Sequence, residues 1–538
     1  MPTIKKLIVK NYKLLRNAII DVNPEINIFV GDNDSGKSTI LEVISILTSG
    51  KLNGVPLDRQ IKANLFNNES RFEYINEIKL GHTPCPPEIT LEAYFDGDPK
   101  HIGTQNSQSE NTAGIRIVIY LPSENTDIYL TMLNNTEIKD IPVELYTTSY
   151  HYFNGDDVYF RNSPFTSIFI DTRKKAYTNI VDHFISDSVA NNLSRQEIME
   201  LSTVYRRSRE NFRSSNSVKK LNSNVNSNPM IQGKKVTLDL IEDEVEGWKY
   251  QMSIVIDDIP FENIGLGTQN AIKIELALKN ASTQADVVIM EEPENNLAFM
   301  NMARLVNRVL RSTGKQVFIS THSSYIANKL DLGNVLLVNK GNVVHFSSLS
   351  ADTKKYFIKI PGYDTLRFVL ADKTIMVEGP TDDLIVQRAY RDVNGHLPFD
   401  DGIDVFVVNS LAFLRFCEIA KLIHKNVVIV TDNDGSIQEN IEEKYSEYYK
   451  KPGFTFYFES DENLRTIELS VLQANCVNGQ PSVSFTKAIS SRSSMINADY
   501  SRILNFMLQN KAEWAYRVFE SDEIINYPEY IQDVIKHF

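Results

Sequence analysis

A short glycine-rich loop near the N-terminus constrains the fold of this chain more than any other feature. Residues 31–38 read Gly-Asp-Asn-Asp-Ser-Gly-Lys-Ser and match the pattern G-x-x-x-x-G-K-[ST] at every fixed position. The loop follows an apolar run, Ile26–Val30, and precedes an apolar segment, Thr39–Leu47, so a strand, a loop and a helix are predicted in that order. Backbone N–H groups of such a loop, at the start of a helix, point at phosphate oxygens. An α/β domain that binds a nucleotide is therefore the first prediction.

The side chains of this loop predict how a nucleoside triphosphate and its magnesium ion would bind. Lys37 would neutralise the β- and γ-phosphates, and Ser38 would coordinate Mg²⁺. ATP is the expected nucleotide. The residues of the loop and helix start that we expect at the nucleotide are Gly31, Asn33, Gly36, Lys37, Ser38 and Thr39.

Two later apolar runs also end in residues suited to phosphate chemistry. Val287–Met290 is followed by Glu291 and Glu292, a pattern typical of a Walker B strand. Glu291 would hold Mg²⁺, directly or through water, and Glu292 would polarise the attacking water. Val317–Ser320 leads to His322, which is placed to reach the γ-phosphate. A solvated acidic turn and a structural histidine are the alternatives.

A second group of carboxylates follows two strand-like runs in the C-terminal half. Ile375–Val377 is followed by Glu-Gly-Pro-Thr-Asp, and Val427–Val430 is followed by Thr-Asp-Asn-Asp-Gly. Short apolar runs bounded by glycine are typical of buried parallel strands, and ligands bind at the carboxyl ends of such strands. Clustered carboxylates repel each other unless a cation lies among them, and oxygen ligands suit Mg²⁺ or Mn²⁺. The residues expected to meet there are Glu378, Asp382, Asp432 and Asp434.

Between these runs, a helical segment and a further strand complete a doubly wound unit. They are Asp383–Arg391 and Val405–Val408. Elsewhere, short β-like runs alternate with polar turns over residues 88–170, and residues 176–215 look helical. The Ser/Asn-rich residues 214–228 predict a mobile loop, with order resuming near Val236.

Length and charge narrow the class of protein. A chain of 538 residues is too long for one core, and its net charge of −13 is wrong for a protein that simply coats nucleic acid. Any DNA contact must use local basic patches or metal ions. The arginines of residues 206–213 are one such patch, although a solvated helix face is the plainer explanation.

The cysteines and the apolar runs indicate a cytoplasmic protein. Cys85, Cys417 and Cys476 are isolated and lack metal-ligand spacing, which fits a reduced compartment. No apolar run approaches the roughly 18 residues that span a bilayer, so no membrane partner is expected. The first residues lead into a strand rather than a secretory signal.

Residues 1–345 resemble the ABC ATPase head of DNA-repair and chromosome-maintenance proteins. The resemblance implies that residues 265–270, Gly-Leu-Gly-Thr-Gln-Asn, are the signature loop, with Gly267 and Gln269 at nucleotide held by a second head. Leu266 stands where that family has a serine, and a leucine cannot hydrogen-bond a γ-phosphate, which puts efficient hydrolysis in doubt. Because such heads work in pairs, residues 151–230 are interpreted as a helical dimerisation insert.

Residues 372–475 resemble the Toprim domain of topoisomerases, primases and certain nucleases. The motifs are Glu-Gly-x-x-Asp at Glu378 and Asp-x-Asp-Gly at Asp432. The resemblance implies that Asp432 and Asp434 bind metal and that Glu378 acts as a ligand or general acid/base. Two Mg²⁺ or Mn²⁺ ions would activate water and stabilise the leaving oxygen of a phosphodiester.

An ABC head followed by a Toprim domain resembles the OLD (overcoming lysogenization defect) nuclease family, which includes the nuclease subunit of the Gabija antiphage system and retron-associated relatives. Leu464–Glu468 is similar to a Thr-Leu-Glu segment of that family, which adds Glu468 as a metal ligand. Asn510–Ala515 is similar to its Asn-Lys-x-x-x-Ala segment, so Lys511 would stabilise charge on the scissile phosphate.

The predicted architecture is α/β in both halves. An ABC-type ATPase head (residues 1–150 and 231–365) is interrupted by the insert with its loop (151–230). A Toprim domain (366–475) and a helical C-terminal region (476–538) follow.

Three functions fit this architecture. The first is a nucleotide-regulated, divalent-metal-dependent DNA endonuclease in antiphage defence, working as a dimer or tetramer. A helicase subunit, or a retron reverse transcriptase with its DNA–RNA, is a candidate partner. The second is an ATP-dependent repair-type clamp on DNA with a non-catalytic Toprim scaffold. The third, a topoisomerase or primase, would need a nucleophilic tyrosine on another domain, and no room remains for the winged-helix domain that usually carries it.

Overall fold

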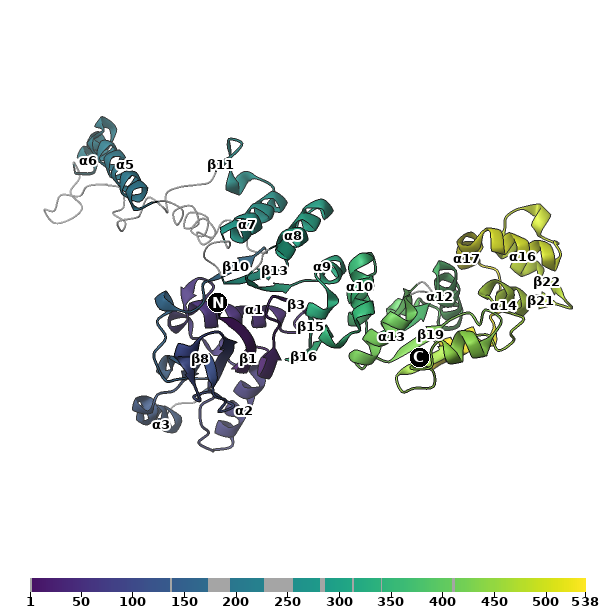
Figure 1. Cartoon of the computed structure of the whole chain (residues 1–538), viewed down its shortest axis with the longest axis horizontal. Coiled ribbons are helices and arrows are strands. Elements are labelled where there is room, and N and C mark those ends of the chain that lie inside the picture. Colours follow the sequence, from purple (N-terminus) through teal and green to yellow (C-terminus); the bar gives the residue numbers. More distant parts are fainter. Residues whose placement is uncertain are drawn as a thin grey trace. The chain divides into compact units, whose positions relative to one another are not determined.

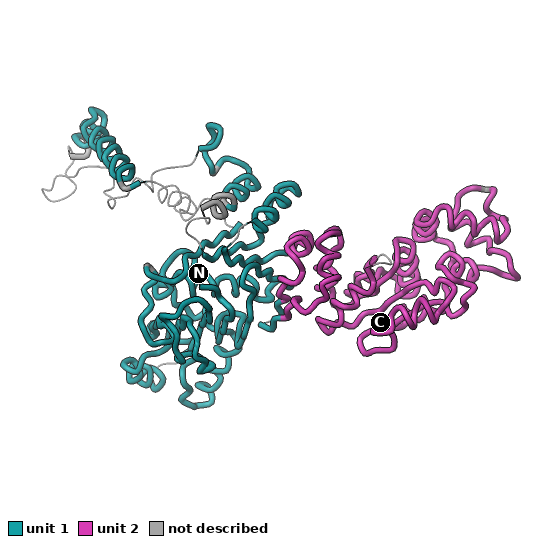
Figure 2. The backbone as a smooth tube through the Cα atoms, viewed as in Figure 1, with its two compact units in different colours: residues 1–322, 338–343 teal, residues 323–337, 344–538 magenta. Residues whose placement is uncertain are grey.

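The computed structural model describes residues 2–135, 138–172, 194–226, 255–280, 286–311, 314–339, 341–408 and 412–538. The chain divides into two compact units, Met1–His322 with Val338–Val343 and Ser323–Leu337 with Val344–Phe538 (Figure 2). Across these described ranges, no helix has the length and apolar character that crossing a membrane requires.

A parallel sheet carries the glycine-rich loop of the first unit. Four of its six strands lie in the order β10 (Ser167–Asp171), β13 (Val287–Glu291), β14 (Gln316–Ser320) and β3 (Ile26–Val30). Helix α1 (Lys37–Ser49) packs on β10, β13 and β14 (Figure 1). β13 and β14 are buried along their whole length, as expected for parallel strands covered on both faces. The predicted strand, loop and helix around residues 26–47 are therefore confirmed.

An antiparallel sheet forms the rest of this unit's core. Its strands lie in the order β2, β1, β6, β8 and β7, and β9 pairs with β8. Their bounds are β1 (Thr3–Tyr12), β2 (Leu15–Asp21), β6 (Ile89–Asp96), β7 (Ile102–Gly103), β8 (Thr112–Tyr120) and β9 (Thr147–Tyr152). The β-like runs predicted over residues 88–170 are thus confirmed, with α3 (Thr126–Asn135) between β8 and β9.

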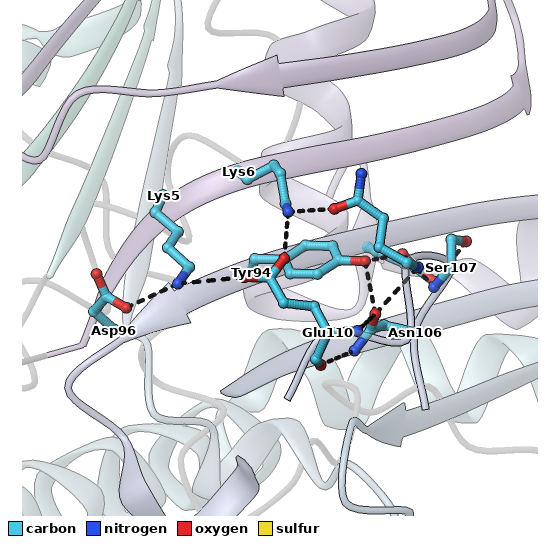
Figure 3. Close-up of polar contacts among 9 residues, drawn as sticks. Lys5, Lys6, Tyr94, Asp96, Asn106, Ser107 and Glu110 are labelled. Atoms are coloured by element: carbon cyan, nitrogen blue, oxygen red, sulfur yellow. Dashed lines mark hydrogen bonds and ion pairs between the residues drawn. The ribbon is translucent and has the colours of Figure 1, made fainter. Parts of the chain in front are cut away.

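A polar network holds the loop between β7 and β8 against strand β6 (Figure 3). The hydroxyl of Tyr94 lies 3.0 Å from Glu92 Oε2 and 3.1 Å from Asn106 Oδ1, and its single proton is donated to one of these two acceptors. Glu92 is fully buried, and it also accepts the backbone N–H of Ser107 at 2.9 Å. Lys6 lies over the Tyr94 ring at 4.1 Å. Because a buried carboxylate is costly unless it accepts several hydrogen bonds, this loop has one strongly preferred position.

Two expectations for the middle of the chain are wrong. Residues 214–228 are not simply a loop, because Asn216–Asn226 forms helix α6 after α5 (Arg195–Ser214). Val218 and Leu221, three residues apart, give one side of α6 an apolar character that the Ser/Asn-rich composition concealed. Residues 151–230 are also not wholly a helical insert, because β10 belongs to the parallel sheet. The prediction that ordered structure resumes near Val236 falls on residues outside the described ranges, which resume at Val255.

The second unit is built on a four-stranded parallel sheet. The strand order is β18 (Ile403–Val407), β17 (Lys373–Val377), β19 (Val427–Val430) and β20 (Phe454–Tyr457). Helix α12 (Pro380–Asn394) connects β17 to β18. The chain passes to one side of β17 and then to the other, which confirms the predicted doubly wound unit and creates a switch point between β17 and β19.

Helices from the C-terminal region cover one face of this sheet. Ile375 and Val377 alternate along β17 and share a core with Trp514, which is fully buried. Helix α12 contacts α17 and α18, and α18 contacts β20. The predicted helical C-terminal region is confirmed as α15 (Val483–Ile489), α16 (Tyr500–Gln509), α17 (Lys511–Glu520) and α18 (Glu529–His537).

The remaining longer elements complete both units. They are α2 (Asn68–Lys79), α7 (Leu266–Asn280), α8 (Phe299–Arg311), α9 (Ser324–Lys329), β15 (Val335–Asn339), β16 (Asn342–His345), α10 (Ala351–Lys359), α11 (Thr365–Leu370), α13 (Phe413–Leu422) and α14 (Ile467–Ala474).

Gln316 gives a test of how the two sheets of the first unit are joined. Its buried side chain accepts the N–H of Ile4 at 3.0 Å and donates to the carbonyls of Ile4 and Asn23, both at 2.7 Å. Gln316→Leu leaves these three backbone groups without that partner, and each unsatisfied buried group costs about 1–3 kcal/mol. We expect the melting temperature of this unit to fall by at least about 5 °C and the amides of β1 to exchange faster in hydrogen–deuterium exchange.

Gln473→Leu is the matched control, because Gln473 is exposed and lies in the other unit. Unchanged exchange of β1 in Gln316→Leu would show that the glutamine does not join the sheets.

Candidate functional site

The glycine-rich loop lies between β3 and α1 and is folded around the side chain of its own lysine. Lys37 Nζ donates to the carbonyls of Gly31 and Asp32, each at 2.8 Å. Gly36 caps α1 with a φ of 111°, a conformation that favours glycine. Burial lowers the pKa of Lys37, while the nearby carboxylates of Glu292 and Asp32 oppose this shift. A buried cation at a helix start is suited to an anion such as a phosphate.

Ser38 and Glu291 line one cavity of about 250 Å³, so the loop and the Walker B strand meet as predicted. Thr39 lines the same cavity. Asp171 also lines it, from the end of β10, where it lies opposite Glu291 in the parallel register. The sequence analysis missed Asp171, although an apolar run that ends in an acid, Ile168–Asp171, was the available signal.

Glu292 and His322 lie together at the ends of β13 and β14. His322 Nε2 is 3.7 Å from Glu292 Oε1, and the amide of Asn295 donates to Glu292 Oε2 at 2.7 Å. Glu292 has a φ of 45°, a left-handed conformation that turns the chain sharply after β13. The backbone N–H of His322 donates to Glu294 Oε1 at 2.7 Å. Glu294, also missed from the sequence, is largely buried, and this burial raises its pKa.

The residues predicted as the signature loop pack within their own head. Gln269 is 2% exposed, and its side chain donates to the Ile264 carbonyl at 2.9 Å. A Cβ on Gly267 would lie 2.1 Å from the carbonyl oxygen of Asn296, so only glycine fits there. Asn33, by contrast, is exposed on the loop before α1. A contact between Gln269 and a second copy would require its side chain to leave the Ile264 carbonyl.

The second group of carboxylates gathers at the carboxyl edge of the four-stranded sheet in the other unit. Glu378 follows β17, and Asp432 and Asp434 follow β19. Asp382 lies in the first turn of α12, where its Oδ2 accepts the Gly379 N–H at 3.1 Å. Glu468, in the first turn of α14, is buried. These five residues are called the acidic centre below.

The charges of the acidic centre act on one another. Burial raises the pKa of Asp432 to about 9, and the carboxylates of Asp382, Glu378, Glu468 and Asp434 add to the shift. Burial likewise raises the pKa of Asp382 to about 7, with Glu378 and Glu468 contributing. The charges that act most on Asp432 are therefore all negative, which fits a cation by charge. Among the described residues, however, no three acid, histidine or cysteine groups are grouped closely enough to hold a metal ion as they stand.

Backbone and side-chain hydrogen bonds fix the turn after β19. Glu378 Oε1 accepts from Thr431 Oγ1 at 2.5 Å and from the Asp432 N–H at 3.3 Å. The fully buried Asn433 donates to the carbonyl of Glu459 at 2.7 Å and accepts the Gly435 N–H at 2.9 Å. Sequence reasoning treated Asn433 as a spacer, but it holds the turn that presents both aspartates.

The positions of Lys511 and Tyr530 relative to the acidic centre differ from what the sequence indicated. Lys511 begins α17 and is exposed, and within the described residues it forms no hydrogen bond or ion pair with the acidic centre. Tyr530, in α18, was not singled out, yet its phenol is buried beside the centre. Burial raises the pKa of Tyr530 well above its ordinary value, and Asp432 and Asp382 contribute to the rise.

Comparisons with known proteins agree with this division of the chain. Residues 3–154 and 166–327 match the AAA ATPase domain family, and residues 369–434 match the TOPRIM domain of overcoming lysogenization defect protein-like proteins. The ATPase match covers more than half of the chain. Glu378, Asp382, Asp432 and Asp434 fall within the second match, whereas Glu468 and Lys511 lie beyond it.

One curated relative and several solved structures are similar to parts of the chain. The DNA replication and repair protein RecF of Teredinibacter turnerae is 34% identical over 98 residues, 18% of this chain. The chain spans about a quarter, 24%, of that relative. An Smc head domain derived from Pyrococcus furiosus matches 67% of this chain and 100% of its own, with 14% identity and a TM-score of 0.35.

A structure of the recombination mediator RecF with ATPrS matches 64% of this chain and 98% of its own, with 11% identity and a TM-score of 0.32.

The phosphate-binding loop with its Walker B strand and the acidic edge of the parallel sheet lie in the two matched domains. The chain therefore belongs to the AAA ATPase-domain family and joins that domain to an OLD-like Toprim domain, the architecture of the OLD-family ATPase–Toprim nucleases.

Proposed function

We propose that this protein is a nucleotide-regulated, divalent-metal-dependent DNA endonuclease whose cleavage site is the acidic centre. The observation that carries the proposal is the convergence of five carboxylates at the switch point of the Toprim sheet, with Asp432 surrounded by negative charge. Such a cluster is costly without a cation, and ligands of doubly wound sheets bind at this edge. Mg²⁺ or Mn²⁺, two ions in our proposal, would activate water and stabilise the leaving oxygen of a phosphodiester.

In this proposal the residues of the acidic centre divide the work. Asp432 and Asp434, from the turn that Asn433 holds, and the buried Glu468 bind metal. Glu378 acts as a ligand or general base, since its Oε1 is already oriented by Thr431. Lys511 would approach the scissile phosphate only when DNA is bound, because it has no contact with the centre among the described residues.

The ATPase domain would sense or hydrolyse ATP and regulate the cut. Lys37 and Ser38 would bind the phosphates and Mg²⁺, with Glu291 completing the metal site and Glu292 orienting water. Two heads would engage through Gln269 and its neighbours. Leu266 offers no hydrogen bond to a γ-phosphate, which favours slow hydrolysis and a role as a sensor.

Removing carboxylates of the acidic centre tests the cleavage proposal. Asp432→Asn and Glu378→Gln should each reduce nicking of supercoiled plasmid in Mg²⁺ or Mn²⁺ by at least about 100-fold, because each removes a negative ligand or base from the reacting phosphate. Gel electrophoresis with and without ATP measures the nicked product. Asp400→Asn is the matched control, since Asp400 is exposed on the same unit and lies outside the acidic centre.

Three outcomes would contradict this reading in different ways. Full nicking by Asp432→Asn would place cleavage elsewhere. DNA binding without cleavage by the wild type in Mg²⁺, Mn²⁺ and Ca²⁺ would favour the clamp with a non-catalytic Toprim domain, and a covalent protein–DNA adduct trapped by denaturant would favour a topoisomerase.

The raised pKa of Asp432 predicts a metal-dependent stability. Asp432 holds its proton to about pH 9 in the folded chain but ionises near pH 4 when unfolded. Between these values the folded state binds more protons, so the metal-free protein loses stability as the pH rises. We expect Asp432→Asn to raise the metal-free melting temperature at pH 8 by about 3 °C, and this gain to shrink toward pH 5.

Added Mg²⁺ or Mn²⁺ should reverse the order of the melting temperatures of the wild type and Asp432→Asn. A cation offsets the repulsion in the wild type, so the metal should raise the wild-type melting temperature more than that of Asp432→Asn. Equal metal-dependent shifts in both proteins, read by differential scanning fluorimetry, would argue against a cation bound by Asp432.

Lys37→Ala tests nucleotide control separately from cleavage. Loss of the buried ammonium should weaken ATP binding by at least about tenfold and should make plasmid nicking insensitive to ATP. Lys51→Ala is a control, because Lys51 lines the same cavity from outside the glycine-rich loop. Nicking by Lys37→Ala that still responds to ATP would contradict nucleotide control through this loop.

The biological setting is part of the same proposal. We infer a role in antiphage defence, as a dimer or larger homo-oligomer, with a helicase subunit or a retron reverse transcriptase and its DNA–RNA as candidate partners. Phage plating on cells that express the wild type or Asp432→Asn tests this role. Protection by both proteins would disconnect defence from cleavage.

A further inference from the structure

A pocket in the second unit is lined by Asp383, the residue that follows Asp382 of the acidic centre. It has a volume of about 460 Å³ and lies between α11, the start of α12 and strand β18. Tyr363 supplies an aromatic wall, and Arg367, Asp383 and Gln387 supply polar groups. Phe406 also lines the pocket but is only 3% exposed. The functions discussed above use none of these residues.

The flat groups of this pocket are held in place. Arg367 donates through Nε to Asp404 Oδ2 at 3.0 Å, and its guanidinium lies 5.6 Å from the centroid of the Phe406 ring. The hydroxyl of Tyr363 is 3.1 Å from that of Tyr356. Fixed aromatic and guanidinium planes are the surfaces on which unpaired nucleobases stack.

The polar groups favour an amine over a phosphate. Asp383 accepts from Gln387 Nε2 at 2.6 Å, and Asp364 adds a second carboxylate to the lining. Arg367 is already paired with Asp404, so the pocket as a whole does not attract anions. Carboxylate and carboxamide oxygens accept hydrogen bonds from exocyclic amines of cytosine, adenine or guanine, which thymine lacks.

The pocket and the acidic centre lie on two sides of one helical turn. Asp382 faces Glu378 and Glu468, whereas the next residue, Asp383, lines the pocket. Consecutive Cα atoms are about 3.8 Å apart. Strand order agrees, because β18, which lines the pocket, is the direct neighbour of β17, which leads to Glu378. The pocket and the acidic centre are therefore lined by consecutive residues of one helix, Asp383 and Asp382.

We propose that this pocket receives one unpaired, amine-bearing base of the DNA strand whose phosphate lies at the acidic centre. The proposal rests on the proposed nuclease function and adds a preference for DNA with an unpaired or extruded base. Stacking on Arg367 and Tyr363 would hold the base, and Asp383 would select for the amine. Extrusion is easiest where the base is already unpaired.

Binding of defined duplexes to the full chain tests the proposal. Each fluorescent duplex carries one bulged dC, one bulged dT or one bulged abasic site, and anisotropy is read in Ca²⁺. The wild type should bind the dC duplex about tenfold more tightly than the abasic duplex, with dT between them, because dT stacks but lacks the amine. Asp383→Leu should bind dC and dT equally while still preferring both to the abasic site. Asp400→Leu, an exposed control on the same unit, should behave as the wild type.

The wild-type comparison needs no variant to fold, so it stands alone. Equal binding of dC, dT and abasic duplexes by the wild type would overturn the proposal, as would a dC preference retained by Asp383→Leu. Displacement of the dC duplex by micromolar free deoxycytidine would assign the pocket to a soluble nucleoside and also overturn it. Plasmid nicking without any base preference would contradict the pocket proposal but not the nuclease proposal. Base preference without cleavage would contradict the nuclease proposal but not the base-binding pocket.

Discussion

Repulsion among clustered carboxylates, two of which (Asp382 and Glu468) are buried, is the constraint on which the second unit depends. Five acids converge at one edge of a parallel sheet, and the charges that act most on Asp432 are negative. In a medium of lower dielectric than water this repulsion is strong, so the fold must hold the acids in place at a cost. The means are visible: Asn433 ties the turn after β19 to the 459–461 segment, Thr431 orients Glu378, and an apolar core that includes Trp514 packs beneath them. A site assembled at such a cost is suited to a cation.

The first unit also has acids at the ends of parallel strands, but there a lysine lies beside them. There, too, acids follow neighbouring parallel strands, with Asp171 opposite Glu291 in the register. The difference is Lys37, a buried ammonium near Glu292 whose hydrogen bonds go to carbonyls of its own loop. Acids beside a cation and a helix start are suited to a phosphate with its metal ion, whereas acids alone are suited to the metal ion. Both units therefore present acids at the ends of parallel strands, and the ammonium of Lys37 distinguishes the first unit from the second.

What could be predicted from the sequence follows from the same physics. Apolar runs that end in acids identified β13, β17 and β19. A strand that is buried on both faces is apolar at every position, so the acids that follow it are easily recognised in the sequence. Helix α6 was missed because its polar composition outweighed the spacing of Val218 and Leu221. The role of Asn433 could not be read, since its partners lie 26 and 28 residues along the chain. Lys511 came from family resemblance alone, and local sequence says nothing about its distance from the acidic centre.

The signature loop shows how engagement of a second head would reach the catalytic turn. Gly267 lies against the Asn296 carbonyl, where any Cβ would clash, and Asn270 Nδ2 donates to the Asn295 carbonyl at 3.1 Å. The amide of Asn295 in turn donates to Glu292 Oε2. The start of α7 is thus joined to Glu292 by two hydrogen bonds and one close backbone contact. A movement of the start of α7 that exposes Gln269 to a second head would either break the contacts of Gly267 and Asn270 or displace Glu292. Packed contacts of this kind switch between discrete arrangements and do not deform smoothly. If two heads pair as proposed, these contacts would link their pairing to the position of Glu292.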